Sequence, residues 1–200
     1  MNTRFYDFAK AAVRLGVRVI WGARVVGTQN VPAEGPLIVA CNHLSYLDPP
    51  AMGSLCPRRL SYMAKKELFE IPVLGPMIRA LGAYAVDRHG SATAAVRRSL
   101  KVLQEGGAVG IFPEGTRNRT GDVEPQIGVA LLASLANAPV VPASIRGTDR
   151  ALRLGRISVA FGPPLTPPAG RKARREDLAK FTLQIMNAIE ALGKGTHGNP

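Results

Sequence analysis

The sequence has little of what builds disulfide frameworks and zinc sites. It contains two cysteines, Cys41 and Cys56, and three histidines, His43, His89 and His197, among 200 residues. The cysteines do not have the spacing of a zinc site, and the histidines cluster neither with one another nor with the cysteines. We therefore expect no metal site, no disulfide framework and a reducing compartment.

Acidic residues are also scarce. Fourteen Asp and Glu stand against 26 Lys and Arg, which gives a formal net charge of +12. An excess of this size indicates an anionic partner, such as nucleic acid, a phosphate-bearing substrate or an anionic membrane surface. Signatures of helix-turn-helix, RNP and zinc-finger proteins are missing, and the aromatic residues do not interleave with the basic ones as stacking platforms would. We therefore expect no nucleic acid partner.

The N-terminal region lacks an uninterrupted hydrophobic run. Residues 4–21 carry five charged side chains, whereas a membrane-spanning helix needs about 20 mostly apolar residues. The charges run through the apolar region and no small-residue cleavage site follows, so a signal peptide is not expected either. At about 100° per residue, the charged side chains fall within an arc of roughly 120° of a helix.

This pattern predicts an amphipathic helix with a mainly basic stripe. The helix could pack on the protein's own core, or it could lie in a membrane interface with Trp21 near the headgroups. We favour the membrane because the apolar arc is wide and the polar face is basic.

Short apolar runs alternate with helical patterns along the rest of the chain, which predicts an α/β fold with a largely parallel central sheet flanked by helices. Strands are expected at 37–41, 60–64, 83–86, 108–112, 139–145 and 157–161, and helices at 92–104, 127–136 and up to residue 192. We expect a membrane-associating helical segment at residues 1–27, one folded domain at 28–192 and a flexible tail at 193–200.

A histidine and an aspartate follow the first of these strands. Asp48 could hold one ring nitrogen of His43, and the pair would form two thirds of a hydrolase triad. No Gly-x-Ser-x-Gly elbow occurs in the chain, so the nucleophile would be a hydroxyl that the substrate brings. Alternatively, Asp48 is the N-cap and Pro49 the first residue of a helix, and His43 is simply satisfied at a strand end. Cys41 inside the apolar strand is expected to pack rather than react.

Two later loops carry further candidate residues directly after strands, where α/β sheets place their ligands. Glu114, Gly115 and Arg117 follow the strand at 108–112, and Arg88 follows the strand at 83–86. Taken singly, Arg88 could be an ordinary surface arginine and Glu114-Gly115 mere turn chemistry.

Four blocks taken in order resemble the lysophospholipid acyltransferase family, the 1-acylglycerol-3-phosphate acyltransferases. The first has the spacing His-x4-Asp, the second ends in arginine, the third contains Pro-Glu-Gly-Thr-Arg and the fourth is a strand with a central proline. They lie at residues 42–48, 82–88, 112–117 and 140–145. The resemblance covers about residues 28–165, and it implies a glycerolphosphate acyltransferase-like fold and an acyltransferase domain.

The resemblance implies transfer of an acyl group from acyl-CoA or acyl carrier protein, as co-substrate and without a cofactor, to a lysophospholipid hydroxyl. The expected acceptor is 1-acylglycerol 3-phosphate, which gives phosphatidic acid. His43 would be the general base, oriented by Asp48. The enzyme would work as a peripheral or monotopic protein on anionic phospholipid at the cytoplasmic face of the cell membrane.

The substrate phosphate would be bound by Arg88, Glu114, Gly115 and Arg117. Guanidinium groups pair with phosphate oxygens, and glycine allows close approach of the backbone. Glu114 would position Arg117 or bind a glycerol hydroxyl.

One departure from the family pattern concerns the acceptor. The family often has a lysine where this chain has Gln126. Glycerol 3-phosphate or a glycolipid is an alternative acceptor. Hydrolysis of the thioester, with water in place of the acceptor, is an alternative reaction.

Overall fold

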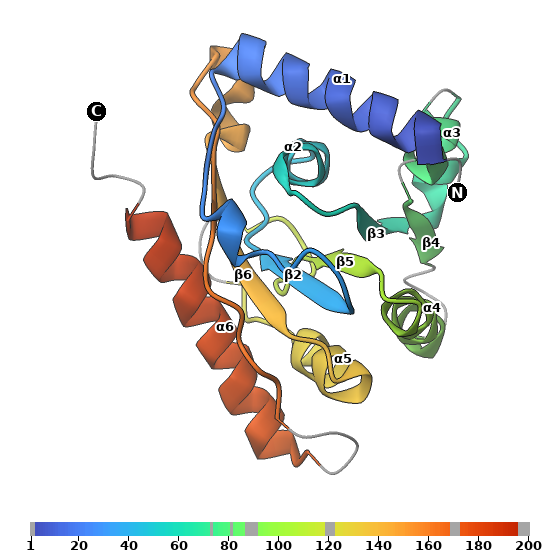
Figure 1. Ribbon diagram of the computed structural model, residues 1–200, viewed down its shortest axis with the longest axis vertical. Coiled ribbons are helices and arrows are strands. Elements are labelled where there is room, and N and C mark those ends of the chain that lie inside the picture. The colour runs from blue at the N-terminus through green and yellow to red at the C-terminus, as the bar shows by residue number, and fades with distance from the viewer. Residues whose placement is uncertain are drawn as a thin grey trace.

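The structure is a computed structural model that describes residues 3–72, 74–80, 82–86, 92–118, 123–168 and 173–195. Its centre is a seven-stranded sheet (Figure 1). In spatial order the strands are β1 (Arg24–Val26), β7 (Ser158–Phe161), β6 (Val140–Arg146), β2 (Leu37–Cys41), β5 (Ala108–Ile111), β3 (Leu60–Lys65) and β4 (Tyr84–Val86).

Helices cover both faces of the sheet. They are α1 (Thr3–Trp21), α2 (Asp48–Leu55), α3 (Leu74–Ala80), α4 (Ala92–Gln104), α5 (Gly128–Ala136) and α6 (Arg175–Gly195), with 3₁₀ turns η1 (Thr28–Asn30), η2 (Lys66–Phe69) and η3 (Thr148–Arg153). Figure 1 shows α1 and α2 on one face and α4, α5 and α6 on the other. The expected α/β architecture is therefore correct.

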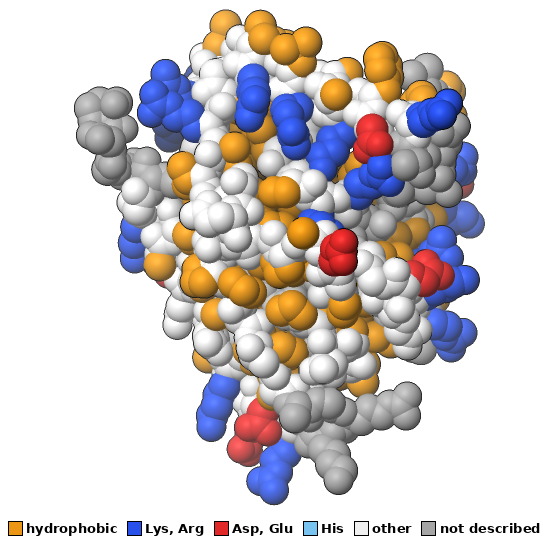
Figure 2. Space-filling view, in the orientation of Figure 1, with side chains coloured by type: hydrophobic (Ala, Val, Ile, Leu, Met, Phe, Trp, Pro, Cys, Tyr) orange, Lys and Arg blue, Asp and Glu red, His pale blue; other side chains and the backbone are white. Residues whose placement is uncertain are grey.

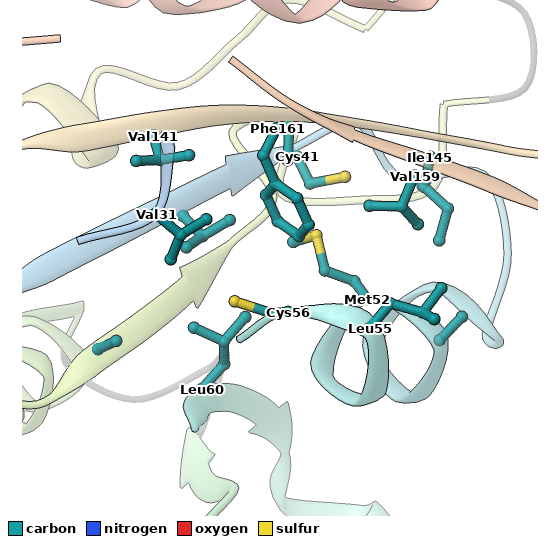
Figure 3. Packing of buried hydrophobic residues seen from close by; sticks show 14 of the residues in the cluster. Val31, Cys41, Met52, Leu55, Cys56, Leu60, Val141, Ile145, Val159 and Phe161 are labelled. Atoms are coloured by element: carbon teal, nitrogen blue, oxygen red, sulfur yellow. The ribbon is translucent and has the colours of Figure 1, made fainter. Parts of the chain in front are cut away.

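The central strand β2 shows why two helical layers form. All five of its residues are buried, and successive side chains of a strand point to opposite faces. Leu37, Val39 and Cys41 pack in the cluster that contains residues of α1 and α2. Figure 3 shows Cys41 in this cluster together with residues of α2. Ile38 and Ala40 pack in the cluster that contains residues of α4, α5 and α6. Because both faces of the strand are apolar, each needs a covering layer.

The sheet is largely parallel, as expected, with one antiparallel contact. β6 and β7 pair antiparallel, whereas β1 pairs parallel with β7. β1 was not foreseen, because a run of three residues carries too weak a pattern and the strand depends on its pairing with β7. The division of the chain at residue 27 stays a prediction, and β1 lies before that boundary yet belongs to the sheet.

The last helix continues further than expected. α6 ends at Gly195 rather than near residue 192. Gly193 is buried, and Arg146 Nη1 donates a hydrogen bond of 2.6 Å to its carbonyl oxygen. Packing on the domain therefore holds the end of the helix, which the local sequence does not indicate.

One side of α1 is part of the domain. Tyr6 and Val17 are buried, and the Tyr6 hydroxyl accepts a hydrogen bond of 3.1 Å from the Leu60 N–H. Trp21, which we expected near headgroups, packs against the core and donates its indole N–H to the Ala151 carbonyl. None of the helices in the described ranges has the length and hydrophobicity required to cross a membrane.

Candidate active site

The candidate site lies at the carboxyl ends of two neighbouring strands. β2 and β5 pair in parallel, with Ala40 opposite Ile111. The loop that follows β2 carries the His-x4-Asp motif, and the loop that follows β5 carries Glu114 and Arg117. Because the two strands are parallel neighbours, both loops leave the same edge of the sheet and meet there.

His43 and Asp48 form the expected pair. Asp48 folds back so that its Oδ2 lies 2.7 Å from His43 Nδ1. The same oxygen accepts hydrogen bonds of 2.6 Å and 2.7 Å from the N–H groups of Leu44 and Ser45. Asp48 is completely buried, whereas the His43 side chain is 17% exposed. The carboxylate is thus fixed by the loop backbone, and the imidazole remains accessible from outside.

The alternative interpretation, in which Asp48 caps a helix, is wrong. α2 begins at Asp48 itself, with Leu47 as its N-cap residue and no hydrogen bond from a capping side chain. The Asp48 carboxylate binds N–H groups that precede the helix, because it is turned back toward His43. The carboxylate therefore organises the His43 loop and not the helix terminus.

Phe112 is a site residue that the sequence did not reveal. Its ring stacks on the His43 imidazole, with centroids 4.2 Å apart and planes inclined by 22°. The Phe112 ring also stacks with the Tyr62 ring, with centroids 6.1 Å apart. The hydrogen bond to Asp48 and this stack together restrict the imidazole to one orientation. An apolar residue at a strand end is usual in a core, so no local signal could have distinguished it.

Glu114 holds the backbone of His43. It is 6% exposed, and its Oε2 accepts a hydrogen bond of 2.8 Å from the His43 N–H. Asn118 Nδ2 donates to Glu114 Oε1 at 3.2 Å, and the Asn118 N–H donates to the His43 carbonyl at 2.7 Å. Burial raises the pKa of the Glu114 carboxyl, and hydrogen bonds from His43 and Asn118 oppose the rise. Binding of substrate by Glu114 stays a prediction, but both its oxygens already accept protein hydrogen bonds.

Arg117 and Gly115 occupy the outer part of the same loop. The Arg117 guanidinium stacks over the ring of Tyr46, which is 71% exposed. Gly115 has φ +66°, and a Cβ built on it would lie 2.7 Å from Gln126 Nε2. The residue that departs from the family pattern therefore touches the loop that carries Arg117. Arg88 lies outside the described residues.

Cys41 lies near His43 and Asp48, but its environment disfavours the reactive thiolate. It is fully buried, and burial together with the negative charges of Asp48 and Glu114 raises the pKa of its thiol well above the usual value. A thiol held neutral in this way is a poor nucleophile. Within the described ranges, no three His, Cys, Asp or Glu side chains are grouped to hold a metal ion.

Comparison with known proteins gives the family of the chain. The family model described as Acyltransferase matches residues 22–146. The chain belongs to the acyltransferase family. Its chemistry is therefore acyl transfer, and the two polar loops lie within the matched region.

Several relatives resemble this acyltransferase over most of its length. It is 33% identical to the 1-acyl-sn-glycerol-3-phosphate acyltransferase of Bacillus subtilis, with 94% of this chain and 96% of the relative covered. It is 28% identical to the enzyme of that name from Streptococcus pneumoniae, with 96% and 74% covered. The crystal structure of PlsC, the 1-acyl-sn-glycerophosphate acyltransferase of Thermotoga maritima, has a TM-score of 0.77 at 23% identity and covers all of this chain and 86% of the other. The fold is thus shared.

Proposed function

We propose that this acyltransferase moves a fatty acyl group from an acyl thioester to the free hydroxyl of 1-acylglycerol 3-phosphate, forming phosphatidic acid. The observation that carries the proposal is the 2.7 Å contact between His43 Nδ1 and the buried Asp48 carboxylate, at the meeting point of the two loops. The names of the Bacillus subtilis and Streptococcus pneumoniae relatives support this acceptor. The acyl donor is acyl-CoA or acyl carrier protein.

The hydrogen bonds of Asp48 support one direction of proton transfer. Its Oδ2 accepts from two backbone N–H groups, as a carboxylate does, so His43 Nδ1 carries the proton that it shares with Asp48. The lone pair of Nε2 is then free to accept a proton. Such a positioned base contributes typically ~10²–10⁴-fold to the rate.

The reaction then balances without a protein nucleophile. The acceptor hydroxyl gives its proton to His43 Nε2 as its oxygen attacks the thioester carbon. The C–S bond breaks, and the leaving thiolate takes the proton from the imidazolium. The products are the ester and the free thiol of CoA or the carrier protein, and Asp48 stabilises the imidazolium between the two steps.

Arg117 is the group that we assign to the acceptor phosphate. Its planar guanidinium can pair with two phosphate oxygens. Gly115, two residues before it, presents no side chain to the ligand. Arg88 remains a second candidate on the strength of the family pattern alone.

We assign the apolar outer face of α1 to the membrane. The exposed apolar side chains of this helix are Phe5, Phe8, Leu15, Val19 and Ile20. Lys10, Arg14 and Arg18 line a hollow of about 410 Å³ beside them, and Lys10 and Arg14 also donate hydrogen bonds to the carbonyls of Arg58 and Ser54. In Figure 2, hydrophobic side chains gather along the upper edge of the molecule, over α1, and a row of Lys and Arg side chains lies just below.

This arrangement suits an amphipathic helix at an anionic lipid interface. The enzyme would then meet its acceptor at the cytoplasmic face of the cell membrane. The two interpretations of the helix are compatible, because one side of α1 packs on the domain and another side remains apolar and exposed.

An acceptor panel tests the proposed reaction. Purified protein is given a radiolabelled acyl thioester with 1-acylglycerol 3-phosphate, glycerol 3-phosphate, a lysophospholipid without a free phosphate, or no acceptor. We expect labelled phosphatidic acid from the first acceptor. Transfer only to another acceptor would reject the assigned substrate, and release of labelled fatty acid in every tube would indicate a thioester hydrolase.

A further inference from the structure

The segment between β6 and β7 exposes two leucines. It comprises η3 and the residues up to Arg156, that is 148–156. Leu152 is 103% exposed, the highest value among the exposed large hydrophobic side chains in the described part of the chain, and Leu154 is 67% exposed. A single exposed leucine is ordinary, but two in one short segment beside a further apolar surface indicate a contact site.

The backbone conformation of Leu154 indicates that this exposed leucine does not stabilise the fold. Leu154 ends η3 with φ +53°, in the left-handed region that disfavours side chains with a Cβ. Glycine would adopt this conformation without strain, and a polar side chain would be better solvated. Leucine at position 154 therefore neither relieves backbone strain nor favours solvation of this segment. Its presence points to a partner that buries the side chain.

Basic side chains flank the two leucines. Arg150, Arg153 and Arg156 are all exposed, and Asp149 is the acidic residue of the segment. Arg150 Nε lies 3.6 Å from Asp149 Oδ2, so these two charges form an ion pair. The excess positive charge of the segment is then that of Arg153 and Arg156. Leucines that protrude between arginines suit an anionic lipid surface, because the apolar groups enter the interface while the cations meet headgroup phosphates.

Hydrogen bonds tie this segment to the C-terminal end of α1. Trp21 Nε1 donates to the Ala151 carbonyl at 2.8 Å, and the Ile157 N–H donates to the Trp21 carbonyl at 3.2 Å. The Arg24 N–H in turn donates to the Ile157 carbonyl at 3.0 Å. Figure 1 shows η3 beside the end of α1 that is remote from the N-terminus. These hydrogen bonds hold the two elements together as one unit.

We propose that residues 148–156 form a second lipid-contacting element, which docks with α1 on the same anionic bilayer. The inference rests on the membrane part of the proposed function. The apolar face of α1 alone contacts the bilayer along one line and leaves the domain able to tilt. A second contact beside the helix end restricts that tilt and so sets the height of the His43 loop above the lipid.

A fluorophore at residue 152 tests the proposal directly. Both native cysteines are buried, so an environment-sensitive label reacts with an added cysteine. We would label Leu152→Cys, Phe8→Cys on α1, and Leu183→Cys, which replaces a 57% exposed leucine of α6. Vesicles contain equal parts phosphatidylglycerol and phosphatidylcholine, or phosphatidylcholine alone.

We expect a blue shift with the anionic vesicles at positions 152 and 8 and none at 183. A shift at position 8 without one at 152 would overturn this inference and leave membrane binding by α1 intact. No shift at either position would overturn the membrane part of the proposed function as well. A shift at 152 that needs no lipid and grows with protein concentration would assign the segment to a second copy of the chain, against the proposal.

A charge substitution gives the quantitative test. Leu152→Asp with Leu154→Asp should lower the vesicle partition coefficient by about tenfold or more, because aspartate removes both apolar side chains from the interface and is repelled by anionic lipid. Leu183→Asp, the matched control, should leave it unchanged. An equal loss in both variants would reject a specific role for the segment, and an unaltered circular dichroism spectrum verifies folding.

Discussion

The Arg117 guanidinium carbon lies 3.8 Å from the centroid of the Tyr46 ring. Tyr46 belongs to the loop of His43 and Asp48, whereas Arg117 belongs to the loop after β5. The contact therefore links the proposed base and the proposed phosphate ligand across two loops. Cation–π contacts at exposed sites contribute about 0.5–1 kcal/mol, enough to bias the orientation of a long side chain.

Removing the Tyr46 ring should weaken acceptor binding. We expect Tyr46→Ala to raise the KM for 1-acylglycerol 3-phosphate by about two- to fivefold, which corresponds to loss of this contact. Tyr46→Phe keeps the ring and should behave as the native enzyme. Arg117→Ala should raise the same KM further, and adding Tyr46→Ala to it should then have little effect. Additive effects of the two substitutions would argue against the coupling.

His43→Ala should abolish acyl transfer with little loss of stability. Removing a general base lowers the rate by typically ~10²–10⁴-fold. Asp48→Asn is a different case, because Asp48 is buried and accepts three hydrogen bonds from the loop. It should lower both kcat and the melting temperature. Single-turnover transfer assays and thermal unfolding separate the two variants, and substantial activity in His43→Ala would remove His43 from the mechanism.

Gly115 should tolerate alanine poorly because of its backbone. At φ +66° a Cβ costs about 1–2 kcal/mol, and the Cβ would also meet Gln126 Nε2. The end of the exposed Gln126 side chain can move aside. The strain of alanine at positive φ should therefore account for most of the lost stability. We expect Gly115→Ala to be destabilised in urea and the added Gln126→Ala change not to restore stability. Full recovery in the double variant would attribute the cost to the contact instead.

Glu114 should make stability depend on pH in the acidic range. Its pKa in the folded protein is raised above the ordinary value of 4.5, chiefly by burial. Between the unfolded and the folded pKa, the native state binds more protons than the unfolded state, so stability falls as pH rises through that window. Glu114→Gln cannot titrate. Relative to this variant, the native protein should lose free energy of unfolding as pH increases from about 4.5. Parallel pH profiles for the two proteins would contradict the expectation.

The outer face of α1 should control membrane binding. Phe8 and Val19 are 73% and 74% exposed, so aspartate at both positions should leave the fold intact and reduce cosedimentation with phosphatidylglycerol vesicles. Raising the salt concentration should weaken binding of the native protein, because the headgroup contribution is electrostatic. Deleting the helix is a poorer test, since Tyr6 and Val17 belong to the core. Unchanged sedimentation of the double variant would exclude α1 as the anchor.

Local patterns were sufficient for much of the fold, and they named candidate site residues whose roles stay predictions. The apolar run of β2 and the 3.6-residue period of α4 predicted those elements at their observed bounds, because burial and periodicity are properties of neighbouring residues. His43, Asp48, Glu114 and Arg117 were also identifiable, since each follows an apolar run that ends in polar residues.

The contacts between distant segments were decided by the tertiary structure alone. β1 forms because β7 pairs with it, Phe112 becomes part of the site because the neighbouring parallel strands β2 and β5 carry both loops, and Glu114 binds the His43 backbone across that same junction. Such contacts depend on which strands become neighbours in the sheet, a property of the whole chain that no local pattern contains. The sequence by itself determined the chemical groups, and the folded sheet decided which of them touch.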